Sequence, residues 1–102
     1  MKKAIRIFAK TPTAIAAFFR TRKSKNVIPP KKGLGFSENF FYMCFGKTPS
    51  KEIIKTFDIS LILYAEHSFN VSTFTARTIT SSLSDIHSAI TGAIGSLKGP
   101  LH

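Results

Sequence analysis

Acidic residues and cysteine are both scarce in this sequence of 102 residues. Five Asp and Glu stand against fifteen Lys and Arg, the net charge is +10, and Glu38 is the first acidic residue. A single cysteine, Cys44, excludes an internal disulfide; it lies among aromatic residues, so we expect a small core side chain and not a reactive thiol. No Cys/His cluster indicates a metal site, and no run of 18 apolar residues indicates a transmembrane helix.

The basic residues are concentrated in the first third, where ten of the fifteen precede residue 33. Such asymmetry is typical of proteins that bind nucleic acid, an anionic membrane or an acidic substrate, and a basic, acid-free start also fits a targeting segment. The basic stretch 20–25 has no interleaved aromatic residue and accompanies no nucleic-acid-binding motif. We therefore favour a solvated or anion-facing surface over a binding site for nucleic acid or a membrane, and over a targeting segment.

The apolar spacing predicts an all-α fold of four helical segments, because no alternating strand pattern is present. The first segment covers about 4–22, with a break at Thr11-Pro12-Thr13. A loop over 26–35 follows, with Lys31 and Lys32 exposed on it. The second segment begins at Ser37 as its N-cap and ends at Gly46.

Two further segments complete the predicted fold. The third begins near residues 48–50 and ends near Glu66-His67. The fourth is a single helix of about 25 residues, from residues 70–72 to about Lys98. Because glycine costs about 1 kcal/mol against alanine inside a helix, Gly92 and Gly95 predict the close approach of another backbone there.

Three histidines are candidates for chemistry. His87 lies on the apolar face of the fourth segment, and we expect it to be packed. His67 follows a helix end among hydrogen-bonding residues. The Gly-Pro stop before His102 predicts a reactive side chain at a helix end, and suggests part of an enzyme cut at its active site. A straight helix would place His67 and His102 about 37 Å apart, so they meet only if it bends or breaks, for example near its glycines.

Several motifs in order resemble the citrate synthase family. They are the stretch LILYAEHSFNVSTFTAR at 61–77, the segment 84–95, and Gly99-Pro100-Leu101-His102. The segments 9–17 and 36–40 also resemble the part of the family that precedes these motifs. The Tyr-Ala-Glu-His form at 64–67 is most similar to the 2-methylcitrate synthase branch. The resemblance thus covers nearly the whole chain.

The resemblance implies an acyltransferase that condenses acetyl-CoA or propionyl-CoA with oxaloacetate, without a metal or cofactor, in a homodimer. It implies that His67 binds oxaloacetate and that His102 is the catalytic donor to the thioester carbonyl and its enol. It further implies that Asn70 and Ser72 support these histidines and that Ser72 fixes the ring of His102.

The family's aspartate base, third histidine, most carboxylate-binding arginines and CoA segment lie beyond the match to His102. Neither Asp58 nor Asp85 matches that base. We therefore expect residues 1–102 to be a partial citrate synthase domain that lacks the family's N-terminal start and everything after His102, and that is inactive alone.

The alternative hypothesis is a non-catalytic basic remnant that binds a membrane, nucleic acid or a synthase subunit. Taken with the resemblance, no nucleic-acid or membrane partner is expected, and a bacterial cytoplasm is favoured over a mitochondrial matrix. Since the family fold is larger, we also expect poorly packed helices with much exposed apolar surface.

Overall fold

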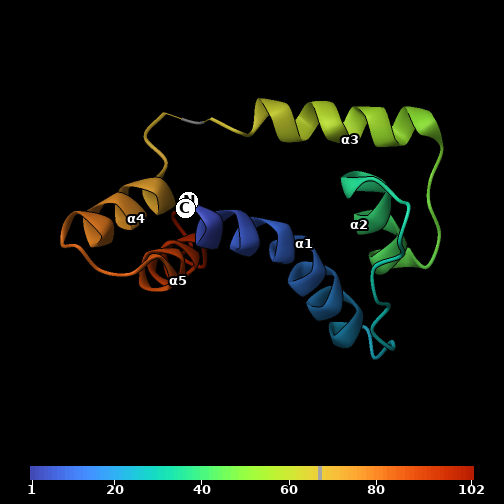
Figure 1. The fold of residues 1–102 in the computed structure, drawn as a ribbon, viewed down its shortest axis with the longest axis horizontal. Helices are drawn as coiled ribbons and strands as arrows, with labels where there is room; N and C mark the ends of the chain where they lie inside the picture. Colours follow the sequence, from blue (N-terminus) through green and yellow to red (C-terminus); the bar gives the residue numbers. More distant parts are fainter. Residues whose placement is uncertain (67) are drawn as a thin grey trace. The chain divides into compact units, whose positions relative to one another are not determined.

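A computed structural model describes residues 1–66 and 68–102 of the chain as a series of helices (Figure 1). No strand occurs in this described part, so the predicted all-α class is confirmed. No helix there is long and apolar enough to cross a membrane. The chain divides into two compact units, Met1–Ala65 and Glu66–His102, and each is described by itself.

The first unit begins with α1 (Lys2–Arg22), which continues through Pro12 where the sequence predicts a break. Proline has no N–H to donate to the Phe8 carbonyl, so one helical hydrogen bond is lost. The helix persists because residues on both sides favour it and its second half packs on α2 (Phe36–Phe45). The predicted break is therefore wrong.

A small core lies between α1 and α2. Ala16, Met43 and Cys44 are buried, and Phe19 and Phe40 pack against them. Only 5% of Cys44 is exposed, which confirms the prediction of a core cysteine. Burial of the thiol raises its pKa, an effect that the nearby Arg20 charge opposes.

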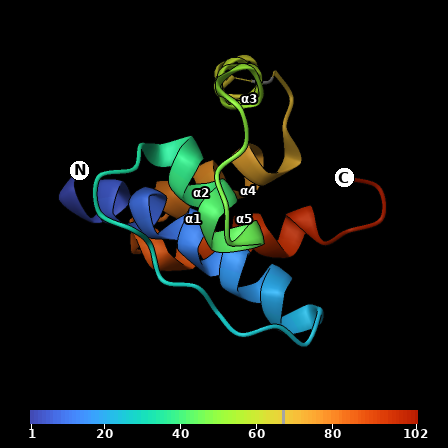
Figure 2. The same ribbon diagram turned by 90° about the vertical axis from the view of Figure 1, so that its right-hand side faces the viewer.

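The loop that returns from α1 to α2 holds the exposed Lys31 and Lys32, as predicted (Figure 2). The Asn39 side chain fixes it, since its Oδ1 accepts from the Lys31 N–H and its Nδ2 donates to the Lys31 carbonyl, each at 2.9 Å. Helix α2 ends at Gly46, as expected; its φ of 79° is one that glycine adopts without strain.

The N-cap of α2 is Gly35, not Ser37 as predicted. The Glu38 carboxylate accepts from the Gly35 N–H at 2.9 Å, so the helix begins two residues earlier. Ser37 is instead buried, and its hydroxyl donates to the carboxylate of Asp58 in α3 (Lys51–Leu63). Helix α3 begins after the N-cap Ser50 and ends three residues before the predicted Glu66.

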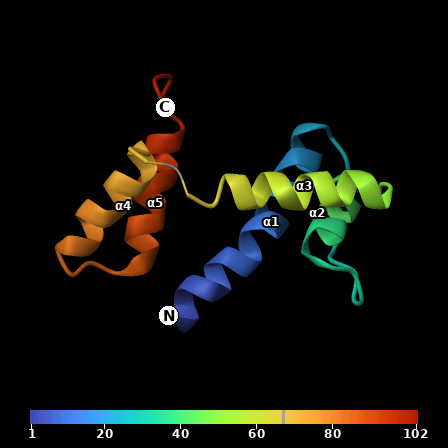
Figure 3. The same ribbon diagram turned by 90° about the horizontal axis from the view of Figure 1, so that it is seen from above.

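The second unit is a pair of helices where the sequence predicts one. Helices α4 (Val71–Ser81) and α5 (Ile86–Leu97) lie side by side and are joined by a short turn (Figures 1 and 3). In the turn Leu83 has a φ of 62°. Asp85 then caps α5, because its carboxylate accepts from the N–H groups of His87 at 2.8 Å and Ser88 at 3.1 Å. The predicted single helix is therefore wrong.

The two glycines of α5 differ in their surroundings. A Cβ added to Gly92 would overlap Cδ1 of Ile79 and lie 3.3 Å from Cγ2 of Thr75, both on α4. A Cβ on Gly95 would meet no atom within 4 Å. The expected close approach of another backbone is therefore wrong at both glycines: at Gly92 the nearest atoms belong to side chains of α4, and at Gly95 no atom lies within 4 Å.

Apolar surface is abundant, as expected. Among the described residues the buried apolar side chains are Ala16, Met43, Cys44 and Ala89. Large apolar residues such as Ile62, Leu63 and Phe74 are more than 70% exposed. The expectation of poorly packed helices is confirmed, because few side chains are buried in either unit.

Candidate functional site

The chain turns back after α5, and this turn brings His102 to the first turn of α4 (Figure 2). The His102 N–H donates to the Gly99 carbonyl at 3.1 Å, which closes the turn. Nε2 of His102 then lies 2.9 Å from Oγ of Ser72. The two residues are 30 positions apart in sequence, and the antiparallel course of α4 and α5 lets them meet.

Ser72, on α4, contacts both α5 and the C-terminal tail that carries His102. Its hydroxyl also donates to the Ala93 carbonyl of α5 at 2.8 Å. A second polar contact between the helices lies one turn further on, where Oγ1 of Thr75 and Oγ of Ser96 are 2.7 Å apart. These contacts set the register of α5 on α4, and through it the position of the tail that carries His102.

Asn70 supports the same corner as the N-cap of α4. Its Oδ1 accepts from the Thr73 N–H at 2.9 Å and from the Thr73 hydroxyl at 3.3 Å. An N-cap of this kind stabilises a helix by about 1 kcal/mol. Asn70 therefore fixes the start of the helix that presents Ser72.

The other two predicted histidines have different outcomes. His67 lies outside the described residues, so its meeting with His102 stays a prediction. His87 is exposed in the first turn of α5, and the expectation of a packed side chain is wrong. The reason is Asp85, which starts a new helix there and puts His87 at a helix end. A Ser-Asp pair before an apolar run is the sequence signal of that cap.

Two features of the second unit escaped sequence reasoning. The Ala93 carbonyl is a backbone group, and no residue type marks a carbonyl that accepts from a distant serine. The pKa of Asp85 is lowered, first by the hydrogen bond from the Ser88 hydroxyl and then by backbone N–H groups. The described residues contain no group of three metal-ligating side chains.

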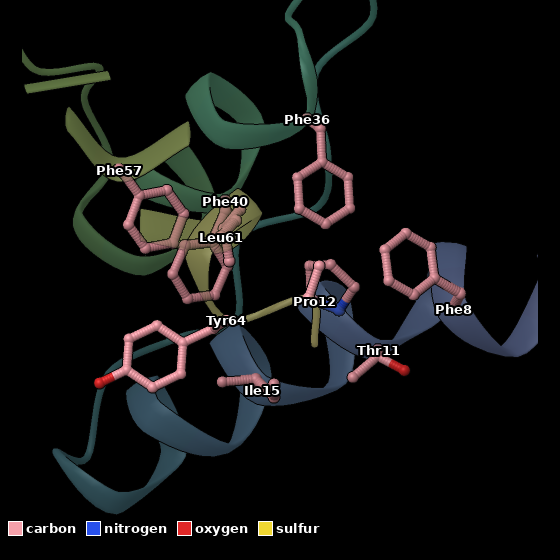
Figure 4. A pocket seen from close by; sticks show the side chains of 10 residues that line it. Phe8, Thr11, Pro12, Ile15, Phe36, Phe40, Phe57, Leu61 and Tyr64 are labelled. Carbon is pink, nitrogen blue, oxygen red and sulfur yellow. The ribbon is translucent and has the colours of Figure 1, made fainter. Parts of the chain in front are cut away.

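An open pocket of about 500 Å³ lies in the first unit (Figure 4). Apart from the hydroxyls of Thr11 and Tyr64, its lining side chains are apolar: Phe8, Pro12, Ile15, Phe36, Phe40, Phe57, Leu61 and Ala65. No histidine, carboxylate or lysine is among them, so the phenol of Tyr64 is the one lining group of a kind that transfers protons. The chemistry-bearing corner is that of Ser72 and His102.

Comparison with known proteins identifies the family. The model of the citrate synthase C-terminal domain matches residues 1–102. The chain is 52% identical to a citrate synthase of Mycolicibacterium smegmatis, over 98% of this chain and 27% of that protein. It is 53% identical to a 2-methylcitrate synthase of Mycobacterium tuberculosis, over 98% of this chain and 25% of that protein. The chain thus spans about a quarter of the length of these curated relatives.

Solved structures agree with the sequence matches. Citrate synthase from Pyrobaculum aerophilum matches with a TM-score of 0.84 and 42% identity, over 89% of this chain and 22% of that one. A ternary complex of Thermoplasma acidophilum citrate synthase with carboxymethyl coenzyme A and oxaloacetate matches with a TM-score of 0.81 and 34% identity, over 93% of this chain and 25% of that one. The chain is therefore a member of the citrate synthase family.

Proposed function

We propose that these residues form the part of a citrate synthase-type active site that binds oxaloacetate and activates the acyl-CoA thioester. The observation that carries the proposal is the 2.9 Å contact between Ser72 Oγ and His102 Nε2. With Nε2 engaged, Nδ1 is the ring nitrogen that remains for a substrate oxygen. Support also comes from relatives named citrate synthase and 2-methylcitrate synthase, to which the chain is 52% and 53% identical.

The proposed chemistry is proton abstraction next to a thioester. Removing the α proton places negative charge on the thioester oxygen, and a fixed donor there stabilises the enol. A donor of this kind contributes about 3–4 kcal/mol to lowering the barrier. A neutral imidazole donates from Nδ1 when its Nε2 accepts a hydrogen bond, which Ser72 supplies when its hydroxyl points to that nitrogen. Acyl-CoA is a substrate in this scheme, and no metal or cofactor is required.

The remaining roles follow the family pattern. His67 binds oxaloacetate, while Asn70 caps the helix that presents Ser72. Tyr64 favours propionyl-CoA, and hence 2-methylcitrate as product, over acetyl-CoA. The intact enzyme is a homodimer of the bacterial cytoplasm. A polypeptide of these 102 residues contains no match to the family's aspartate base and does not catalyse the condensation by itself.

A hybrid enzyme tests the proposal. The matching quarter of the Mycolicibacterium smegmatis citrate synthase is replaced by this chain, and CoA release is measured with oxaloacetate and either acyl-CoA. The hybrid releases CoA, and the 102-residue polypeptide does not. Ser72→Ala lowers kcat about tenfold, the effect of roughly 1.4 kcal/mol. His87→Ala, at an exposed position, is the control and leaves kcat unchanged.

Two results contradict the proposal. One is CoA release by the 102-residue polypeptide with both substrates. The other is an active hybrid in which Ser72→Ala and the His87→Ala control have equal kcat values, since the Ser72 contact would then have no part in the reaction.

A further inference from the structure

The Ser72 hydroxyl has two hydrogen-bond partners but only one proton. The Ala93 carbonyl, 2.8 Å away, can only accept. The imidazole Nε2 of His102, 2.9 Å away, can accept or donate according to its tautomer. Both contacts form together only when Ser72 donates to Ala93 and accepts from a protonated Nε2.

We infer that the Ala93 carbonyl selects the tautomer of His102, through the proton of Ser72. While the Ser72 hydroxyl donates to the Ala93 carbonyl, the neutral imidazole of His102 is protonated at Nε2 and unprotonated at Nδ1. The ring then presents an acceptor at Nδ1 and not a donor. This inference goes beyond the proposed function and rests on it in one respect, that Nδ1 faces the thioester oxygen.

The donor form of His102 requires Ser72 to turn. If the hydroxyl releases Ala93 and donates to Nε2, the Nε2 proton leaves to water and water supplies a proton to Nδ1. No electron is transferred, and the ring stays neutral. Rotation of one hydroxyl thus converts a ring that accepts at Nδ1 into one that donates there.

The spacing of α4 and α5 determines whether Ala93 stays within reach. Gly92 precedes Ala93 and lies where a Cβ would overlap Ile79 of α4. The contact between the hydroxyls of Thr75 and Ser96 holds the same turns together at 2.7 Å. Close packing of α4 and α5 therefore keeps the Ala93 carbonyl within hydrogen-bond distance of Ser72. A larger distance between the two helices breaks that bond, and the Ser72 hydroxyl can then donate to His102. The Ala93 carbonyl is a positioning group that acts through Ser72.

NMR of the 102-residue chain labelled with ¹⁵N-histidine tests the inference at alkaline pH, at which an ordinary imidazole is neutral. The ¹⁵N chemical shifts of the ring show His102 of the parent chain protonated at Nε2. Ser72→Ala removes the contact, and the His102 ring takes the tautomer ratio of His87, which is also exposed. Replacing Ile94 with its α-hydroxy analogue turns the Ala93 carbonyl into an ester oxygen, which is a weaker acceptor, and the ring shifts toward the Nδ1–H tautomer.

A matched control separates this effect from weakening of the helix. The α-hydroxy analogue at Thr91 weakens the Ile90 carbonyl of the same helix and leaves the His102 tautomer unchanged. A parent ring protonated at Nδ1, or an equal shift from both esters, would overturn the inference. The tautomer is read without substrate, so CoA release by the 102-residue polypeptide would refute the proposed function and leave this result standing.

Discussion

Replacing each glycine of α5 by alanine tests how closely α4 and α5 pack. Both changes remove a residue that lowers helix stability by about 1 kcal/mol relative to alanine. At Gly95 a Cβ meets no atom within 4 Å, so nothing offsets this gain. Gly95→Ala therefore raises the free energy of opening α5 by about 1 kcal/mol.

Gly92→Ala adds an overlap with Cδ1 of Ile79 and a contact of 3.3 Å with Cγ2 of Thr75. Overfilling a packed site costs about 1–3 kcal/mol, and the tip of Ile79 can rotate away, which keeps the cost toward the lower end. Set against the same propensity gain of about 1 kcal/mol, the net change runs from none to a loss of about 2 kcal/mol. The two variants thus differ by about 1–3 kcal/mol.

Amide hydrogen exchange of α5 measures both variants, because it reports the local opening free energy without requiring that the whole chain unfold in one step. Slower exchange in Gly95→Ala than in Gly92→Ala is the expected order. Equal stabilisation by both substitutions would refute the close packing at Gly92, and with it the tight helix pair that keeps Ala93 against Ser72.

Further predictions concern side chains of both units. Arg20 donates to the carbonyls of Asn26 and, at 3.0 Å, Cys44, and its charge opposes the raised pKa of the Cys44 thiol; Arg20→Gln raises that pKa further, as the pH dependence of iodoacetamide alkylation will show. Ser37→Ala removes a buried donor to Asp58 and lowers the urea unfolding free energy of the first unit by about 1 kcal/mol; an unchanged value would show that the contact contributes nothing. The pKa of Asp85 is lower in the folded chain than in the unfolded chain, so the unfolded chain binds a proton at this carboxylate more readily. The ionised Asp85 therefore stabilises the fold at pH values above its unfolded pKa, and this stabilisation is lost as the pH falls through its folded pKa. Asp85→Asn keeps a capping side chain and flattens that acid-side loss of α5 protection in hydrogen exchange, whereas an equally steep loss in the variant would assign it to another group.

The helices that the sequence predicted well are those with an apolar face and a clear stop. Gly46 ended α2 because a left-handed residue closes a helix readily only when it is glycine. Cys44 was correctly predicted to lie in the core, because its neighbours in the sequence are mostly aromatic and a small apolar side chain among them is buried with them. The resemblance to citrate synthases was confirmed because its motifs are long and ordered.

The errors have physical causes. Pro12 predicted a break, but a proline removes one hydrogen bond and its neighbours kept the helix. Asp85 was not recognised as a cap, so α4 and α5 were predicted as one helix with His87 packed in its middle, whereas His87 is exposed in the first turn of α5. The break between α4 and α5 lies at residues 82–85, before both Gly92 and Gly95, near which the sequence had suggested a bend. The contact of Ser72 with Ala93 was beyond prediction, because a carbonyl acceptor has no sequence signature.

The role of His102 as donor to the thioester oxygen is tested most directly by kcat of the hybrid enzyme with and without that side chain. At saturating oxaloacetate and acyl-CoA, His102→Ala should lower kcat by about 10²–10³-fold, the effect of removing one oxyanion donor. A kcat for His102→Ala within twofold of the parent hybrid would contradict the account, because the side chain that contacts Ser72 at 2.9 Å would then contribute nothing to the reaction.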